Sequence, residues 1–133
     1  MKEILHGRVQ TGQNDASRWL GLYNEAYCRK TGMNIFPGSL NLIIEHKFDW
    51  RAAKYQPFII RFGREEMGGE RDILLLPCVL TNLDKRKAFL WTTTNLDRED
   101  AEIIEIITDV KLRDECGLAD GDLVELEIFC ANG

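Results

Sequence analysis

Short segments in which hydrophobic and polar residues alternate occur along most of the chain and predict strands. Within 39–44, Leu40 and Leu42 share one face of the predicted strand, whereas Ser39 and Asn41 share the other. In 102–107, the isoleucine spacing also suits an amphipathic helix, but four β-branched residues in six favour a strand. We expect strands over 2–11, 39–44, 58–62, 72–80, 87–94, 102–107 and 123–129.

A single helix is predicted near the N-terminus. Hydrophobic positions recur at helical spacing over 19–30, Ser17 is a suitable N-cap, and Gly32 is expected to end the helix. Turn-forming residues separate the other elements, namely the polar stretch 12–17, Pro37-Gly38, Gly68-Gly69 and Asn82-Leu83-Asp84.

The last third of the chain has a compact pattern typical of the closing unit of small intertwined β-barrels. It predicts a one-turn helix from Leu112 that Gly117 stops, an apolar plug at Leu118, a tight turn at Asp120-Gly121 and an alternating strand. This pattern indicates architecture but not chemistry, because DNA-binding barrels with swapped hairpins carry it too.

Length and composition favour one soluble domain over 1–133 that is mainly β. The net charge of −5 disfavours nucleic acid and membrane partners, although backbone N–H groups can still bind a small nucleotide. The four cysteines form no zinc pattern, and with no secretory leader we expect reduced, mostly buried thiols in a cytoplasmic protein. The longest apolar run, Ile73 to Leu76, is far shorter than the roughly 20 residues that span a bilayer.

Three segments, in order and spacing, give the chain a resemblance to a known family. They are 7–12 (GRVQTG), 37–42 (PGSLNL), and 102–107 (EIIEII) followed by 110–113 (VKLR), and Pro77 after a run of leucines also matches. Over nearly its whole length the chain resembles the archaeal-type CTP-dependent riboflavin kinases.

The resemblance implies a closed six-stranded cradle-loop barrel, of the RIFT-like type, with one or two short helices. It also implies Mg²⁺-dependent transfer of the γ-phosphate of CTP to the 5′-hydroxyl of riboflavin, which gives FMN. Riboflavin and CTP would then be the small-molecule partners of a monomer or weak homodimer. By this resemblance the nucleotide-binding residues are Gly12, Gln13, Asn14, Asp15, Ala16, Ser17, Val110, Lys111, Leu112 and Arg113, the flavin-binding residues are Thr94 and Glu105, and the metal ligands are Ser39 and Asn41.

The implied metal ligands agree with elementary chemistry. Ser39 and Asn41 stand at i and i+2 of a strand, so a hydroxyl and an amide oxygen point from the same face about 7 Å apart. Mg²⁺ keeps several waters and takes further oxygens from nucleotide phosphates, so neutral protein ligands are sufficient. The family usually has Thr at the position of Ser39, and the hydroxyl is retained. The same two polar groups would otherwise only satisfy a turn.

Other positions leave alternatives open. The loop after Gly12 lacks the further glycines of the family, which restricts the backbone geometries that bind phosphate, and Asp15 adds repulsion that Arg18 can offset. Arg113 either reaches a phosphate or contacts neighbouring carboxylates of the barrel. Glu105 is either a pocket carboxylate or a solvent-facing one, and no residue is identified as a general base.

Two other functions are compatible with the same barrel. One is a non-catalytic flavin- or nucleotide-binding module, and the other is a swapped-hairpin DNA-binding barrel, which the acidic balance disfavours. The sequence contains no phosphate loop followed by a Lys-Ser or Lys-Thr pair, so it gives no support for an ATP-dependent riboflavin kinase.

Overall fold

The computed structural model describes residues 1–12, 20–21, 23–62, 72–93 and 100–131. Its elements are β1 (Lys2–Gln10), α2 (Asn24–Thr31), β2 (Leu40–Asp49), the 3₁₀ helix η1 (Ala53–Phe58), β3 (Ile60–Phe62), β4 (Ile73–Leu80), β5 (Arg86–Thr93), β6 (Asp100–Ile107), α3 (Leu112–Glu115) and β7 (Leu123–Phe129).

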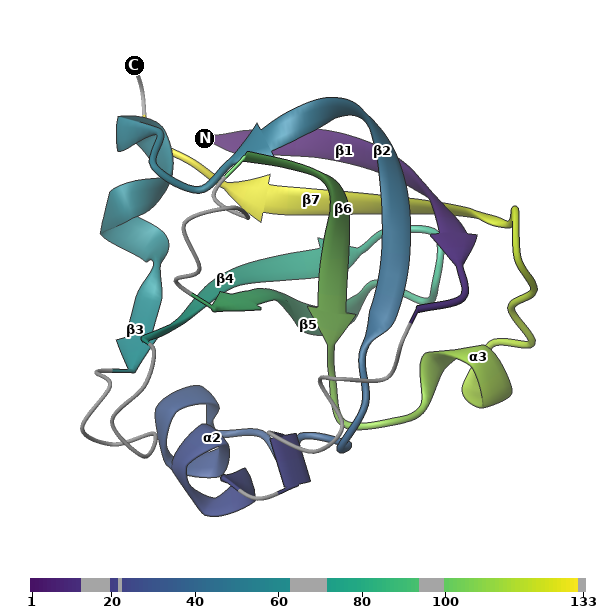
Figure 1. Cartoon of the computed structure of the whole chain (residues 1–133), viewed down its shortest axis with the longest axis horizontal. Coiled ribbons are helices and arrows are strands. Elements are labelled where there is room, and N and C mark those ends of the chain that lie inside the picture. The colour runs from purple at the N-terminus through teal and green to yellow at the C-terminus, as the bar shows by residue number, and fades with distance from the viewer. Residues whose placement is uncertain (13–19, 22, 63–71, 94–99, 132–133) are drawn as a thin grey trace.

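Six of the strands close into an antiparallel barrel (Figure 1). The order β4-β5-β6-β2-β1-β7 returns to β4, because β7 also pairs with β4 through Cys78–Leu80. β3 lies outside this ring and pairs only with the first residues of β4, 73–75. Pro77, which has no N–H to donate, lies between the segments of β4 that pair with β3 and with β7. The predicted closed six-stranded barrel is confirmed.

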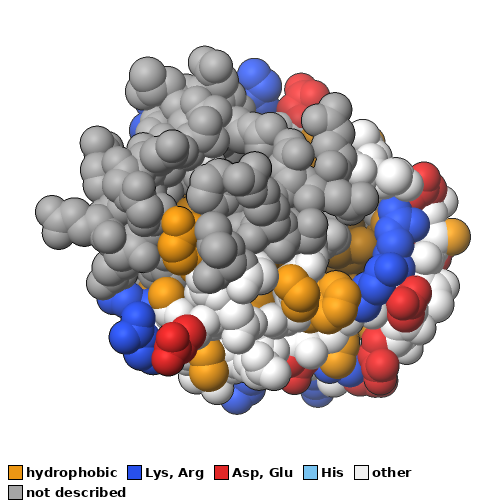
Figure 2. Space-filling model, turned by 60° about the horizontal axis from the view of Figure 1, so that its bottom comes forward, with side chains coloured by type: hydrophobic (Ala, Val, Ile, Leu, Met, Phe, Trp, Pro, Cys, Tyr) orange, Lys and Arg blue, Asp and Glu red, His pale blue; other side chains and the backbone are white. Residues whose placement is uncertain are grey.

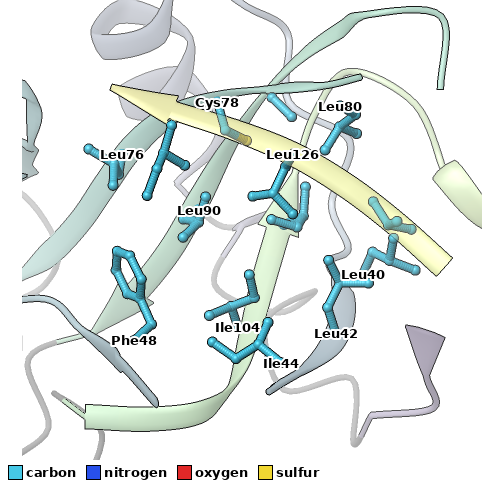
Figure 3. Close-up of a cluster of buried hydrophobic side chains, with 14 of the residues drawn as sticks. Leu40, Leu42, Ile44, Phe48, Leu76, Cys78, Leu80, Leu90, Ile104 and Leu126 are labelled. Carbon is cyan, nitrogen blue, oxygen red and sulfur yellow. The ribbon is translucent and has the colours of Figure 1, made fainter. Parts of the chain in front are cut away.

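The barrel interior is a packed apolar core. Alternate residues of the strands point inward from all sides, as the side chains of Leu42, Leu90, Ile104 and Leu126 illustrate (Figure 3). Leu42 and Leu126 are fully buried. This alternation follows directly from the period of two in a strand, and it places Asn41 on the outer side of β2.

A second apolar cluster lies outside the barrel and explains the uninterrupted apolar run of β4. Tyr27 of α2 packs against the outer face of β4, β5 and β6, and it accepts a hydrogen bond from Nε1 of Trp91 at 2.7 Å. Ile73 and Leu75 are buried in this cluster, whereas Leu74 and Leu76 belong to the barrel interior. Both faces of β4 are therefore covered, which removes the polar alternation.

The closing unit forms as the sequence predicts. α3 is followed by Gly117 with φ 62°, and Leu118 packs against the barrel core. The turn at Asp120-Gly121 binds the end of β1, since Gly121 N donates to Val9 O at 2.8 Å and Val9 N donates to Asp122 O at 2.9 Å. This turn is thereby fixed beside the C-terminal end of β1.

Several element boundaries were wrong in the sequence analysis. Residues 53–58 form η1, so only 60–62 of the predicted strand 58–62 belongs to a strand. β2 starts at Leu40 and runs on to Asp49, with a register shift against β6 between Ile43 and Phe48. The predicted helix 19–30 is interrupted by a turn at Tyr23, after which α2 runs to Thr31. Gly32 ends α2 with φ 71°, as expected, whereas Ser17 lies outside the described residues.

All four cysteines are free, as predicted. Cys78 and Cys130 are buried, Cys116 is half-buried and Cys28 is exposed, so burial of the thiols is less general than predicted.

Among the described residues, no helix has the length and apolar character to cross a membrane.

Candidate functional site

A cavity of about 510 Å³ is lined by residues from the end of β1, the start of β2 and the end of β6, and by residues of α3. In Figure 1 these ends of the strands lie on the side of the barrel that carries α3. The volume of the cavity lies within the range typical of small-molecule sites. The cavity collects three segments that are distant in sequence, and its lining residues are Gln10, Thr11, Gly12, Phe36, Pro37, Gly38, Ser39, Leu40, Asn41, Ile106, Thr108, Val110, Lys111, Leu112 and Arg113.

The two predicted metal ligands both lie in this cavity. Ser39 and Asn41 are half-buried, and Leu40 between them is turned into the core. Ser39 Oγ donates a hydrogen bond to Oε1 of Glu105 at 2.9 Å. Because its proton is committed to Glu105, the Ser39 oxygen presents its lone pairs to the cavity side. The predicted flavin carboxylate and the predicted metal hydroxyl are thus in direct contact.

Asn41 stands in a transverse row of polar side chains on the outer side of the barrel. It is the register partner of Gln10 in β1 and of Glu105 in β6, and Glu105 is in turn the partner of Trp91 in β5. Oδ1 of Asn41 and Oε1 of Gln10 are both buried and have no hydrogen-bond partner within the described part of the chain. We call these two side chains the amide pair. Buried acceptors of this kind are uncommon and point to a ligand that supplies a donor or a cation.

Gly12 is in close contact with Asn41 of the amide pair. A Cβ atom placed on Gly12 would lie 1.6 Å from Nδ2 of Asn41 and 2.7 Å from its Cγ. Any side chain at position 12 would therefore displace the side chain of Asn41, so glycine is favoured here by this contact. The other predicted residues of this loop, 13–17, lie outside the described residues.

The segment from Val110 to Arg113 forms the opposite wall of the cavity. Leu112 is buried in the barrel core and anchors α3, which places Arg113 at the cavity rim. Nη2 of Arg113 donates to Oδ1 of Asp120 at 2.5 Å and to Oγ1 of Thr11 at 3.3 Å. Thr11 Oγ1 also lies 2.9 Å from Oδ2 of Asp120. The hydrogen bonds from Arg113 and Thr11 hold the pKa of Asp120 below its ordinary value.

The described lining of the cavity has positive side chains, Lys111 and Arg113, and no acidic one. Each of the two is paired with a carboxylate outside the lining, Lys111 with Asp114 at 3.7 Å and Arg113 with Asp120 at 2.5 Å, and the chain as a whole carries a charge of −5. On the face that is at the bottom of Figure 1, Lys and Arg side chains stand beside Asp and Glu side chains (Figure 2). Mixed charge of this kind suits a small anionic ligand better than an extended polyanion.

Comparison with known proteins decides the family. The family model that matches residues 9–128 is named for CTP-dependent riboflavin kinase and is described as "Domain of unknown function DUF120". The chain belongs to the CTP-dependent riboflavin kinase family. The resemblance seen in the sequence is confirmed.

Curated relatives of this family support the assignment. A riboflavin kinase of Staphylothermus marinus is 30% identical over 125 residues, which cover 94% of this chain and 91% of the relative. A riboflavin kinase of Archaeoglobus fulgidus is 30% identical over 130 residues and one of Pyrobaculum arsenaticum is 27% identical over 138 residues. The chain spans 54% and 60% of the length of these two relatives, and the matches cover 94% of this chain.

The family is named for a kinase reaction, and such reactions use a divalent cation. The residues present fit this cation. Ser39 and Asn41 offer neutral oxygens, Asn41 Oδ1 is an unsatisfied buried acceptor among the described side chains, and Glu105 adds negative charge through Ser39. Hard oxygen ligands of this type are what Mg²⁺ prefers. Within the described chain, no cluster of three or more His, Cys, Asp or Glu residues offers an alternative metal site.

The predicted flavin residues are only partly placed by the structure. Glu105 is half-buried on the outer side of β6, beside Ser39 and opposite Trp91, and it is not among the cavity-lining residues. Thr94 lies outside the described residues. Glu105 matches neither of the two alternatives fully, because it does not line the cavity and its carboxylate accepts a hydrogen bond from Ser39.

Sequence reasoning missed several lining residues. Gln10 and Thr11 directly precede the predicted loop. Phe36 precedes the segment 37–42, and Thr108 precedes the segment 110–113. Phe36 N donates to Thr108 O at 2.8 Å, which joins the two walls. The polar residues Gln10 and Thr11 at the end of a strand were the available signal.

Proposed function

We propose that this chain transfers the γ-phosphate of CTP to the 5′-hydroxyl of riboflavin, giving FMN, in a Mg²⁺-dependent reaction. The observation that carries the proposal is the single cavity of about 510 Å³ that brings Gly12, Ser39, Asn41 and the 110–113 segment together. Membership of the family and the riboflavin kinase relatives support the same activity.

The nucleotide would lie between the first loop and the 110–113 wall. Lys111 and Arg113 supply positive charge for the phosphates, and the absence of a side chain at Gly12 allows the backbone to approach closely. Residues 13–17 are proposed to complete this contact. Arg113 is already oriented by Asp120 and Thr11, so little side-chain entropy would be lost when it binds a phosphate.

Ser39 and Asn41 would hold Mg²⁺, which supplies charge neutralisation for the β- and γ-phosphates. Both residues line the same cavity, and the hydrogen bond to Glu105 fixes the hydroxyl orientation of Ser39. For the acceptor we propose Glu105 and Thr94 as flavin-binding residues. Positioning and charge neutralisation suffice for phosphoryl transfer, so a general base is not required by the proposal.

The test is direct. Purified protein is incubated with riboflavin, Mg²⁺ and either CTP or ATP, and FMN is measured by chromatography, with a chelator in place of Mg²⁺ as the control. FMN formed with CTP, but not with ATP or with the chelator, is the expected result. FMN formed only with ATP would overturn the proposed donor.

If no FMN were formed with either nucleotide but the protein bound flavin or nucleotide tightly, the result would instead favour the non-catalytic binding module. The glycine-poor first loop, Gln13-Asn14-Asp15-Ala16, is the feature that favours this second function. Tight binding of DNA that weakens steeply with salt would favour the swapped-hairpin barrel.

A further inference from the structure

The amide pair carries an energetic cost in the free protein. A buried carbonyl oxygen that forms no hydrogen bond loses its contact with water without compensation, and natural proteins contain few such groups. Gln10 and Asn41 are register partners of β1 and β2, and Oε1 of Gln10 and Oδ1 of Asn41 are both buried without a partner among the described residues. Two unsatisfied acceptors at adjacent positions of one cavity wall indicate a shared ligand.

Amides elsewhere in the described chain are used for the fold. Nδ2 of Asn24 donates to Ile35 O at 3.0 Å, Nε2 of Gln56 donates to Trp50 O at 2.8 Å, and Asn82 bridges β7 through both ends of its amide. Asn82 shows that an amide of the described chain can satisfy both its oxygen and its nitrogen within the fold, which the oxygens of the amide pair do not.

We propose that Gln10 is a third protein oxygen of the cation site, where Oε1 accepts a hydrogen bond from a cation-bound water. The inference rests on the proposed function, because the cation is the one that Ser39 and Asn41 would hold. Mg²⁺ keeps several waters, and each is a strong donor that needs an acceptor on the protein or the nucleotide. Gln10 is next to Asn41 across the strands and lines the same cavity, so it is placed to accept from this water shell.

The experiment measures cation binding separately from turnover. Mn²⁺ is titrated by electron paramagnetic resonance in the presence of CDP, for the wild type, Gln10→Met and Gln10→Glu. Ile43→Met is the matched control, because Ile43 is two residues from Asn41 on the same face of β2 and is exposed outside the cavity. Thermal unfolding of the metal-free proteins and FMN formation are recorded in parallel.

We expect Gln10→Met to weaken Mn²⁺ binding by about tenfold, and Gln10→Glu, which keeps an oxygen, to bind at least as tightly as the wild type. Gln10→Met should also raise the melting temperature by about 3 °C, because it removes an unsatisfied buried acceptor. A residue with a purely structural role would give a lower melting temperature and no change in Mn²⁺ affinity.

Other outcomes overturn the proposal in distinguishable ways. Unchanged Mn²⁺ affinity in Gln10→Met, or no Mn²⁺ binding by the wild type, would remove Gln10 from a cation site. A lower melting temperature in this variant would contradict the premise that Oε1 of Gln10 is an uncompensated buried acceptor in the free protein. If the wild type made no FMN but Gln10→Met still bound Mn²⁺ more weakly than the wild type, the proposed function would be overturned and the role of Gln10 in the cation site would be retained.

Discussion

The two ends of β1 treat their polar side chains in opposite ways. At the N-terminal end, both carboxylate oxygens of Glu3 have partners, since Oε1 accepts from Lys54 Nζ at 2.9 Å and Oε2 accepts from the hydroxyl of Tyr55. At the C-terminal end, Oε1 of Gln10 is buried in the cavity wall and finds no partner in the described residues. One strand thus connects a polar cluster that is complete to one that is not.

The difference separates groups that serve the fold from groups that serve a ligand. Burial raises the pKa of Glu3, but the hydrogen bonds from Tyr55 and Lys54 outweigh this effect and keep the pKa below its ordinary value. These bonds attach η1 to β1 and close that end of the barrel. The oxygens of the amide pair form no hydrogen bond within the described chain, and such local costs are concentrated at functional sites.

Replacing Asn41 of the amide pair gives the largest expected effect. Asn41→Ala should lower the rate of FMN formation by at least about 100-fold, because it removes a proposed metal ligand. Its free energy of unfolding should change by less than about 1 kcal/mol, since Oδ1 makes no hydrogen bond that the described chain would lose. Steady-state assays and urea unfolding of the same preparations measure both quantities.

Asn82→Ala is the matched control for this variant. Nδ2 of Asn82 donates to Leu123 O and its Oδ1 accepts from Glu125 N, both at 2.9 Å, so its loss should cost about 1 kcal/mol of stability. Asn82 is outside the cavity, and turnover by the folded protein should be unchanged. If Asn41→Ala retained normal turnover at ordinary Mg²⁺, the proposed metal site would be wrong.

Tyr55→Phe tests the complete cluster. The variant keeps the ring, which stacks on Phe48 at 4.8 Å between centroids, and removes only the hydrogen bond to Glu3. We expect a loss of about 1–2 kcal/mol in the free energy of unfolding, measured with urea, because a hydrogen bond to a charged group is removed. Glu3→Gln in the same background should then cost little more. A normal unfolding free energy in Tyr55→Phe would show that the cluster does not stabilise this end.

Much of the barrel could be predicted from alternation, and the exceptions have physical causes. β4 and β7 were found because their residue patterns reflect burial on two faces and on one face. The second half of β2 was missed because Glu45, His46 and Lys47 are exposed in succession at the register shift, which breaks the alternation. η1 was missed because Pro57 and the buried Tyr55 occur in a short segment with no periodic pattern.

The site was predictable where it depended on local spacing and not where it depended on pairing. Ser39 and Asn41 share a face because they are two residues apart in the sequence. The contact of Ser39 with Glu105 depends on the register of β2 against β6, across 66 residues, and no local pattern contains it. The same holds for Gln10, whose importance appears only when β1 and β2 are paired.

The smallest expected effect concerns a cluster beside the cavity that is complete. Asp120 is exposed, and its pKa is lowered mainly by the hydrogen bond from Arg113 and to a smaller extent by the one from Thr11. Because the folded-state pKa lies below the unfolded one, the carboxylate stabilises the fold above about pH 4 and loses this contribution as the pH falls through its lowered pKa. Because Asp120 is exposed to solvent, this contribution is small.

Arg113→Met should raise the pKa of Asp120 toward its ordinary value of 3.8, which a carbon NMR titration of the carboxyl group measures. The same variant should weaken CDP binding, because the guanidinium that Asp120 orients would be lost from the cavity rim. Asp114→Asn, which affects an exposed partner of Lys111, is the control for a general change of charge. A raised pKa of Asp120 with undiminished CDP affinity would leave Arg113 as a purely structural partner of Asp120. In that case one cavity would contain both a polar group that serves the fold, Arg113, and polar groups that serve a ligand, the amide pair.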